Sequence, residues 1–142
     1  MPLSLEVATP SRLVVAETVD EVVIPGSQGY FGVLPGHAPL LATLGVGELT
    51  YRKGASQLHL ALTGGFAEVR NDKVIVLAEN AERPDEIDRE RAQRARERAE
   101  RRLTGREGDV DFARAQGALA RALIRLQVAG HARSPRTVLS AA

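Results

Sequence analysis

At 142 residues, with 44% apolar residues and a formal net charge of +1, the chain fits one domain, or one small domain plus an appendage. It contains no cysteine, which excludes disulfides, thiolate nucleophiles and zinc–thiolate sites. No apolar run approaches the roughly 18 residues that cross a bilayer, and the N-terminus lacks a signal-peptide pattern, so we expect a soluble protein that is not exported.

Charge is distributed unevenly along the chain. Residues 1–84 contain 6 Lys+Arg and 9 Asp+Glu (net −3), whereas residues 85–142 contain the remaining 13 and 9 (net +4). No acidic residue follows Asp111, although five arginines do. We therefore expect a cationic C-terminal arm that suits an acidic partner or a phosphate.

The first half of the chain consists of short runs rich in Val, Leu and Ile, separated by turn residues. The alternation of apolar and polar residues over 3–7 predicts a half-buried strand. Further strands are predicted at residues 13–16, 18–24, 46–52, 58–62, 66–70 and 74–78. Lys53-Gly54 and Asn71-Asp72 are typical of hairpin turns. Many short strands at close spacing predict a sandwich or a barrel.

Residues 26–41 are the most constrained stretch between two strand-like runs. The segment reads Gly-Ser-Gln-Gly-Tyr-Phe-Gly-Val-Leu-Pro-Gly-His-Ala-Pro-Leu-Leu, with four glycines and two prolines. Glycine permits positive φ or close backbone approach, and proline fixes φ. We therefore predict one defined irregular path, which is either a plain connection or an exposed contact surface.

The pattern changes to a helical one at Pro84. Pro84-Asp85 supplies a breaker and a predicted N-cap, with Asp88 three residues on, so a helix is predicted from about Glu86 to Leu103. Its apolar face consists mainly of alanines, and Glu90 with Arg94 and Glu97 with Arg101 are predicted i,i+4 pairs. The apolar positions are Ala92, Ala95, Ala99 and Leu103.

A second helix follows the break at residues 104–108. Asp109 or Asp111 is its predicted N-cap, and it runs to about Ala129. A short glycine-containing connection predicts an antiparallel hairpin over residues 85–130. The predicted apolar stripe consists of Phe112, Ala115, Leu119, Ala122, Leu123 and Leu126. Alanines either permit close helix packing or make a weak contact that can open. Residues 131–142 are predicted to be a mobile tail.

Catalytic motifs are absent from the sequence. It has no phosphate-binding P-loop, no G-x-S-x-G and no H-E-x-x-H, and its histidines lie far apart at 37, 59 and 131, so we expect neither an enzyme nor a metal site. Four arginines are placed to converge on one side of the hairpin, where they form either a solvated face or a phosphate site. These are Arg91, Arg98, Arg121 and Arg125.

Four motifs in order resemble the epsilon subunit family of bacterial ATP synthase. They are Gly-x-x-Gly-x-x-Gly-x-x-Pro-Gly-His-Ala-Pro-Leu-Leu (26–41), Leu-Thr-Gly-Gly-Phe-Ala-Glu-Val (62–69), Val-Leu-Ala-Glu-x-Ala (76–81) and Gly-Asp-Val-Asp-Phe-Ala (108–113). The resemblance implies a ten-stranded β-sandwich over residues 1–84, followed by a two-helix α-hairpin over 85–130. It also implies a non-catalytic subunit of the central rotor stalk.

The resemblance further implies partners. The sandwich of such subunits binds the gamma subunit and the c-ring, which places the chain on the cytoplasmic face of a bacterial plasma membrane, peripheral to it. Tyr30, His37 and Leu40 are the contact residues that the motif suggests, and which of them faces which partner stays open. The hairpin of this family brakes ATP hydrolysis by extending towards the alpha and beta catalytic subunits. Arg114, Arg121 and Arg125 are the candidates for that contact.

Some family members also bind ATP as a regulatory ligand on the folded hairpin, through an [IL]-D-x-x-R-A motif. The fixed positions of that motif correspond here to Ile87, Asp88, Arg91 and Ala92, and the other polar positions to Glu82, Arg98, Arg121 and Arg125. The resemblance implies no other cofactor, and whether protons or sodium ions are coupled stays open. The alternative is a nucleic-acid-binding module with Arg-rich helices, which the near-neutral total charge disfavours.

Overall fold

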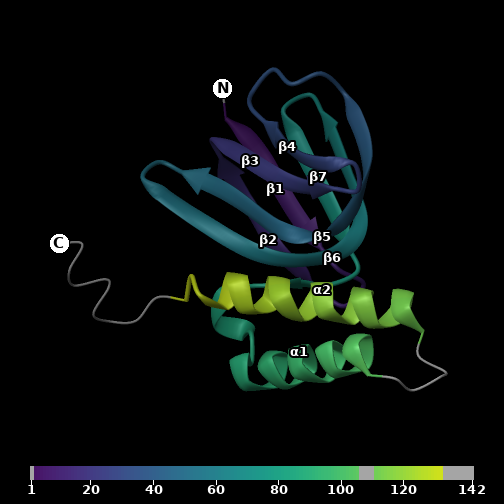
Figure 1. Ribbon diagram of the computed structural model, residues 1–142. Helices are drawn as coiled ribbons and strands as arrows, with labels where there is room; N and C mark the ends of the chain where they lie inside the picture. Colours follow the sequence, from purple (N-terminus) through teal and green to yellow (C-terminus); the bar gives the residue numbers. More distant parts are fainter. Residues whose placement is uncertain (1, 106–110, 133–142) are drawn as a thin grey trace. The chain divides into compact units, whose positions relative to one another are not determined.

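The computed structural model describes residues 2–105 and 111–132. Contacts divide the chain into two compact units, Met1–Glu82 and Arg83–Ala142. The first is built of strands and the second of helices (Figure 1). The predicted fold class, a β-sandwich followed by two helices, is confirmed.

One sheet supplies both layers of the sandwich. Its strands are β1 (Leu3–Ala8), β2 (Leu13–Val19), β3 (Glu21–Gly26), β4 (Gly29–Val33), β5 (Leu40–Lys53), β6 (Ser56–Arg70), β7 (Lys73–Ala78) and β8 (Ala81–Glu82). They pair in the order β2-β1-β7-β6-β5-β3-β4, and β8 also pairs with β6. The β1–β7 pair is parallel and the other strand pairs are antiparallel.

Strand β6 belongs to both layers because it bends at two glycines. Gly64 and Gly65 have φ of +87° and +123°, values that residues with a side chain rarely adopt. A Cβ on Gly65 would also lie 2.0 Å from the Leu77 carbonyl oxygen. The first half of β6 pairs with β8 and the second half with β7, while β5 follows it on both sides of the bend. The long curved ribbons of β5 and β6 are visible in Figure 1.

The core between the layers is made of Leu, Val and Ile side chains and one tyrosine. Leu3, Leu5 and Val7 on β1 are fully buried, as the predicted alternation requires. Tyr51 on β5 is only 1% exposed, and its hydroxyl donates to Glu17 Oε2 on β2 (3.0 Å). Lys53 Nζ donates to the other oxygen of Glu17 (2.8 Å). One carboxylate therefore joins β2 to the far end of β5.

Several predicted strand boundaries are wrong. Residues 29–33, predicted to be irregular, form β4, because their main chain pairs with β3 despite the glycines. The predicted strands at 58–62 and 66–70 are one strand, β6, since the two glycines between them bend the ladder without ending it. The described residues contain eight strands where the resemblance implied ten, and the continuity of β6 accounts for one of the two missing strands. Thr18 belongs to β2, and β3 begins only at Glu21.

The helical unit consists of a 3-10 turn, η1 (Pro84–Glu86), and two helices, α1 (Arg89–Thr104) and α2 (Phe112–Ala129). The prediction that Asp85 caps the first helix is wrong. Ile87 has an extended backbone, and Asp88 is the N-cap, because its carboxylate accepts the N–H of Arg91 (3.0 Å). Asp111 caps α2 in the same way, by accepting from Arg114 (3.1 Å). Of the two predicted caps, Asp109 and Asp111, the structure has Asp111. The helix ends at Ala129, as predicted.

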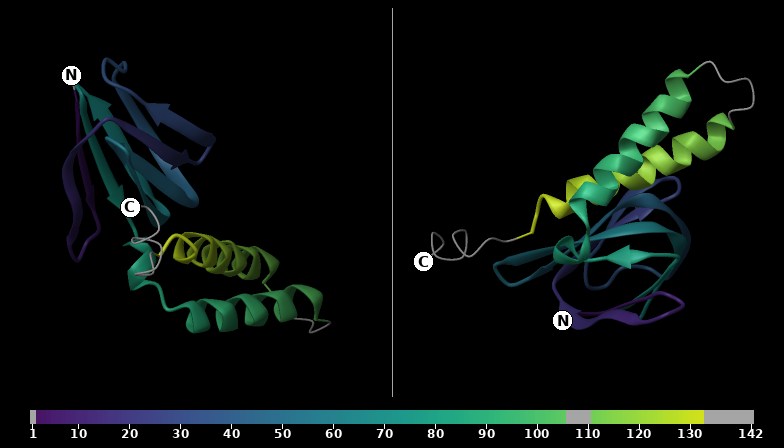
Figure 2. Two further views of the ribbon diagram at one scale, coloured as in Figure 1. Left: turned by 90° about the vertical axis from the view of Figure 1, so that its left-hand side faces the viewer. Right: turned by 90° about the horizontal axis from the view of Figure 1, so that it is seen from below.

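The two helices pack through alanines spaced seven residues apart. Ala92 and Ala99 of α1 are buried, and so are Ala115, Ala122 and Ala129 of α2. Figure 2 shows the two helices side by side and antiparallel. The predicted stripe on α2 is wrong at two positions. Phe112 and Leu123 are 56% and 42% exposed because the helical repeat places them beside this alanine ladder rather than on it.

Two further predictions on this unit have different outcomes. Glu90 and Arg94 pair as predicted (3.9 Å), but Glu97 accepts a hydrogen bond from Gln93 (3.3 Å) where a pair with Arg101 was expected. The predicted mobile tail falls mainly on residues 133–142, which lie outside the described residues. His131 still donates its backbone N–H to Val128, within the last turn of α2 (2.9 Å).

We expect Glu17→Ala to lower the free energy of unfolding of the sandwich by about 1 kcal/mol, because it removes the hydrogen bond to the buried Tyr51. Urea denaturation at pH 7 measures this change. Glu21→Ala is the control, because the side chain of Glu21 makes an exposed ion pair with Arg52 (3.7 Å), so its removal should change the free energy of unfolding little. Equal losses in both variants would contradict the role given to Glu17.

The ion pair between Glu17 and Lys53 predicts that the stability of the sandwich depends on pH. The hydrogen bond and charge of Glu17 raise the pKa of Lys53 above its ordinary value of 10.5. A raised pKa in the folded state means that this stabilisation is complete below about pH 10.5 and is lost as the pH rises through the folded-state value. The stability difference between wild type and Glu17→Ala should therefore narrow above pH 10.5.

Candidate functional site

One face of the sheet carries large apolar side chains that are open to solvent. Leu13, Phe66 and Leu77 are 60%, 55% and 56% exposed. The strand register aligns them, because Phe66 lies opposite Leu77, Leu77 opposite Ala8, and Ala8 opposite Leu13. Leu41, which is 72% exposed, lies on the same face of β5, two residues from the partner of Phe66.

We call these five residues the outer apolar row: Leu13, Ala8, Leu77, Phe66 and Leu41. The row crosses β2, β1, β7, β6 and β5, so residues that are far apart in the sequence form one continuous strip. Proteins without partners rarely expose a contiguous apolar strip of this kind, because burying such side chains is favourable. The row is therefore a candidate docking surface for another protein.

A second exposed surface is the loop of residues 34–39 between β4 and β5. Leu34 is 53% exposed, and Leu40, the first residue of β5, is 37% exposed. Gly36 has φ of +85°, and its N–H donates to Asp72 Oδ1 (2.7 Å). Within the loop, His37 donates its backbone N–H to Leu34 (3.1 Å), and its Nδ1 contacts the Ala38 carbonyl (2.6 Å). The loop thus has a defined conformation, as predicted from its glycines and prolines.

Tyr30 on β4 is also exposed, but its position is fixed. Its hydroxyl accepts the backbone N–H of Glu48 (2.9 Å) and lies where a Cβ on Gly47 would come within 2.5 Å. The register of β3 against β5 shifts next to Pro25, which has no N–H to give to the ladder. The Tyr30 hydroxyl thus accepts a backbone N–H of β5 beside this register shift. The residue itself stays on the surface and is 58% exposed.

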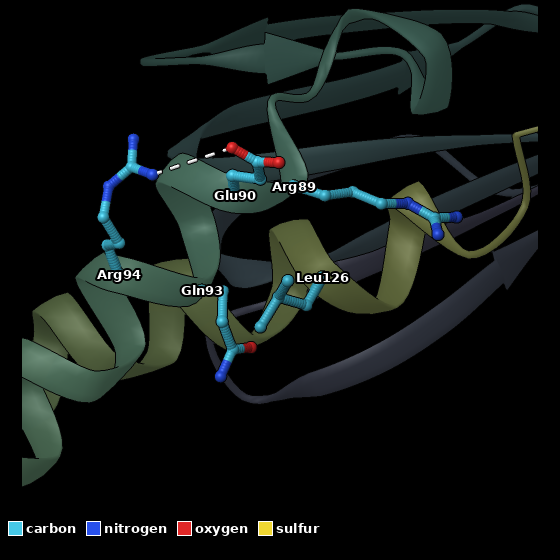
Figure 3. Close-up of a pocket in the computed structure, with 5 residues that line it drawn as sticks. All are labelled: Arg89, Glu90, Gln93, Arg94 and Leu126. Carbon is cyan, nitrogen blue, oxygen red and sulfur yellow. Dashed lines mark ion pairs between the residues drawn. The ribbon is translucent and has the colours of Figure 1, made fainter.

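The hairpin has two flanks with different chemistry. One flank holds a hollow of about 420 Å³, lined by Arg89, Glu90, Gln93, Arg94 and Leu126 (Figure 3). Arg89 reaches across this flank and donates from its guanidinium to the Ala129 carbonyl at the C-terminus of α2. A cation at that position also interacts favourably with the negative end of the helix dipole. Arg89 therefore fastens the start of α1 to the end of α2.

The opposite flank holds the arginines that the sequence singled out. Arg91 and Arg98 each precede a buried alanine of α1 by one residue, and Arg114 and Arg121 do so on α2. One residue corresponds to a rotation of about 100°, and in an antiparallel pair the same offset on both helices leads to the same flank. The helical repeat places Arg125 there as well. The prediction that Arg91, Arg98, Arg121 and Arg125 share one side of the hairpin thus agrees with the helix geometry.

Other residues of the predicted nucleotide site have structural contacts. Asp88 is the N-cap of α1, Ile87 is 9% exposed, and Ala92 lies in the helix–helix contact. Glu82 is on β8, in the unit that precedes the hairpin. Gly117, in the middle of α2, leaves room for Arg121, whose guanidinium would lie 3.2 Å from a Cβ added there. This glycine therefore lets an arginine side chain lie against the helix.

Family comparisons match both halves of the chain. The ATP synthase delta/epsilon chain beta-sandwich domain matches residues 2–84, and the long alpha-helix domain of the same chain matches residues 85–130. The chain belongs to the ATP synthase delta/epsilon family. The family predicted from the four motifs is thereby confirmed, and no comparison supports a nucleic-acid-binding module.

Individual relatives agree with this family. The ATP synthase epsilon chain of Nitratidesulfovibrio vulgaris (strain DP4) is 52% identical over 130 residues, which cover 92% of this chain and 97% of the relative. Epsilon chain 2 of Syntrophotalea carbinolica is 53% identical over 131 residues, 90% of this chain and 94% of that one. A chain in the Euglena gracilis mitochondrial ATP synthase structure with F1 and c-ring superposes with a TM-score of 0.78 at 26% identity, covering 92% and 82%.

The outer apolar row is the feature that the sequence did not reveal in this delta/epsilon family member. A signal for part of it was present, because residues 74–78 are apolar without alternation, which indicates a strand with apolar groups on both faces. The other members could be recognised only once the register was known. In the described residues, no helix has the length and apolar character to cross a membrane.

We expect Arg89→Ala to loosen the hairpin, because it removes the hydrogen bond between the start of α1 and the end of α2. Amide hydrogen exchange in the last turn of α2 should become about tenfold faster, as expected for one charge-assisted hydrogen bond. Arg91→Ala is the control, since this arginine is exposed on the opposite flank. Exchange rates that change equally in both variants, or in neither, would show that Arg89 does not fasten the helices.

Proposed function

We propose that this chain is a structural and regulatory, non-catalytic subunit of the central stalk of an ATP synthase. The observation that carries the proposal is the match of both family domains, in order, over residues 2–130. Relatives named epsilon chain share about half of its residues over nearly their whole length. The chain then contributes no catalytic residues, and acts by binding the gamma subunit, the c-ring and the alpha and beta catalytic subunits.

The sandwich is the anchor in this proposal. The outer apolar row fits the gamma subunit, because a strip of Leu and Phe side chains gains most from a protein partner that covers it. Tyr30, His37 and Leu40 lie on or beside the 34–39 loop and fit contacts with the c-ring or the stalk. Binding to the c-ring would hold the chain at the cytoplasmic face of the bacterial inner membrane, peripheral to it.

The hairpin is the regulatory part in this proposal. The residues that α1 buries are the alanines Ala92 and Ala99 alone, and each methyl group contributes only about 0.8 kcal/mol when buried, so we expect α1 to separate from α2 at low cost. Once extended, Arg114, Arg121 and Arg125 would meet acidic groups of the catalytic subunits and block ATP hydrolysis. No acidic residue after Asp111 opposes that attraction.

ATP is the proposed regulatory ligand of the closed hairpin. Arg91, Arg98, Arg121 and Arg125 share one flank, where guanidinium groups suit phosphate oxygens. The [IL]-D-x-x-R-A match at residues 87–92 supports the same position. Asp88 already accepts a backbone hydrogen bond as N-cap, which leaves its second carboxylate oxygen as the available acceptor for a ligand.

We expect the full chain to inhibit ATP hydrolysis by a catalytic head depleted of its epsilon subunit, and a chain ending at Pro84 to bind without inhibiting. Phe66→Ser with Leu77→Ser should weaken binding of either form about 100-fold or more, since each side chain loses about 2 kcal/mol of burial. In the full chain, Leu123→Ser is the control for an exposed apolar residue on another surface.

Failure of the wild-type chain to bind a matched gamma-containing head would remove the proposed function. Binding of both forms without inhibition would remove the regulatory part alone. Undiminished binding of the Phe66/Leu77 variant would leave the function but place the contact elsewhere on the sandwich.

For the ligand, we expect Arg98→Ala to weaken ATP binding about tenfold or more in a calorimetric titration, because it removes one phosphate contact. Asp88→Ala is a poor test, since it also removes the N-cap of α1. Arg94→Ala is the matched control, because Arg94 is on the same helix but lines the hollow on the other flank. Identical titrations for wild type and Arg98→Ala would exclude this flank as the nucleotide site.

A further inference from the structure

The loop of residues 34–39 is held by very little packing. Leu34, Pro35, Gly36, Ala38 and Pro39 are all exposed, and only His37 is partly buried. The hydrogen bonds of His37 are to Leu34 and Ala38, inside the loop itself. These contacts give the loop its shape, but they do not fix its position relative to the sandwich.

The side chain of Asp72 fixes the position of the loop relative to the sandwich. The N–H of Gly36 donates to Asp72 Oδ1 (2.7 Å), and among the described residues this is the one hydrogen bond that links residues 34–39 to another element. Asp72 is itself held firmly, because its carbonyl accepts the N–H of Ser4 on β1 (2.9 Å) and its φ of +58° belongs to the tight turn between β6 and β7. An acceptor on a rigid turn therefore holds a donor on an otherwise exposed loop.

Asp72 lies in the turn between two strands of the outer apolar row, so its hydrogen bond to Gly36 connects the loop to that row. The turn at Asn71 and Asp72 joins β6 and β7, the two strands that carry Phe66 and Leu77 of the outer apolar row. The hydrogen bond therefore links the loop directly to the strands of the row. The covalent route from Gly36 to the row, in contrast, runs through the partly buried His37 and then through exposed residues to Leu41 on β5.

We propose that Asp72 is a positioning residue, whose carboxylate holds the 34–39 loop in a fixed relation to the outer apolar row. The proposal rests on the proposed function, in which the row binds the gamma subunit, and it assigns the loop to the c-ring, one of the two partners proposed for it. Two surfaces that engage two partners at once gain more affinity from each other when their geometry is fixed in advance, because less conformational freedom is lost on binding. With Asp72, the loop already has its binding position when the row binds the gamma subunit. Without Asp72, the loop must become ordered when it binds the c-ring, and the conformational entropy lost in that step weakens binding.

The turn allows a clean set of variants. Asp72→Gly removes the carboxylate and accepts the positive φ, whereas alanine would add backbone strain. Asp72→Asn keeps an oxygen acceptor and tolerates positive φ, so it should rescue the bond. Asn71→Gly is the backbone control, because Asn71 also has positive φ (51°) in the same turn.

Asp20 provides a matched hydrogen bond at the other end of β5. Its Oδ2 accepts the N–H of Gly54 at 2.7 Å, and Gly54 has φ of +58° in the β5–β6 turn. Asp20→Ala thus removes the same kind of contact, a carboxylate on a turn glycine, far along the strand from the 34–39 loop. It also removes an exposed ion pair with Arg52 (3.6 Å), which should contribute little. In the full chain, Asp72→Gly should speed amide exchange of Gly36 and not of Gly54, and Asp20→Ala should do the reverse.

The deciding measurement is binding of the full chain to the isolated gamma subunit and to a detergent-solubilised gamma–c-ring complex of the same organism. We expect Asp72→Gly to bind gamma alone like wild type and the gamma–c-ring complex about tenfold more weakly, the size of one hydrogen bond to a carboxylate. Asp72→Asn, Asn71→Gly and Asp20→Ala should bind both like wild type.

Equal affinity of wild type and Asp72→Gly for the gamma–c-ring complex would overturn the proposal. So would an equal loss in Asn71→Gly or Asp20→Ala, which would show a general effect of loosening the sandwich. A wild-type chain that binds neither gamma nor the gamma–c-ring complex would contradict the proposed function itself. That outcome is distinct, because it does not depend on any variant.

Discussion

The bend of β6 at Gly64 and Gly65 is the constraint on which the sandwich depends. Both residues have positive φ, and the Leu77 carbonyl leaves no room for a Cβ on Gly65. Because of this bend, one strand pairs with β8 before it and with β7 after it, and a single sheet covers both sides of the core. The same bend sets where Phe66 lies, since it is the first residue after the two glycines. The apolar surface on the outside is thus a consequence of the local geometry that closes the inside.

The sequence predicted those structural features that are determined by residues close together in the chain. The hairpin turn at Asn71 and Asp72 and the strand at residues 3–7 follow from neighbouring residues, and both were predicted. The cap of α2 was narrowed to Asp109 or Asp111. The start of α1 was misplaced because Asp85 and Asp88 offer rival caps three residues apart. Only the extended backbone at Ile87 decides between them. β4 was missed because its glycines have low strand propensity, and pairing with β3 overrides that preference.

The same distinction explains which candidate surfaces could be predicted from the sequence. The arginine flank of the hairpin was predicted because helical spacing can be read directly from the sequence. The outer apolar row could not be, because Leu13, Leu77 and Phe66 become neighbours only through the parallel β1–β7 pair and the antiparallel pairs beside it. The bond from Gly36 to Asp72 was hidden for the same reason. It joins two turn motifs that were each recognised, but whose proximity depends on sheet order.

The two units differ in how strongly they are held, and this difference suits the parts assigned to them. The sandwich core contains fully buried Leu, Ile and Val side chains from most of its strands, each contributing about 1.5–3 kcal/mol, so its outer face is a rigid platform. In the helical unit, α1 buries only Ala92 and Ala99, while α2 buries three alanines together with Ile124 and Val128. Each alanine methyl group contributes about 0.8 kcal/mol as an upper estimate, and the Arg89 bond adds to this. A ligand at 100 times its Kd stabilises the form that it binds by about 2.7 kcal/mol. That is of the same order as the burial of the alanine methyl groups, so a ligand that binds only the closed hairpin would shift the equilibrium substantially towards the closed form.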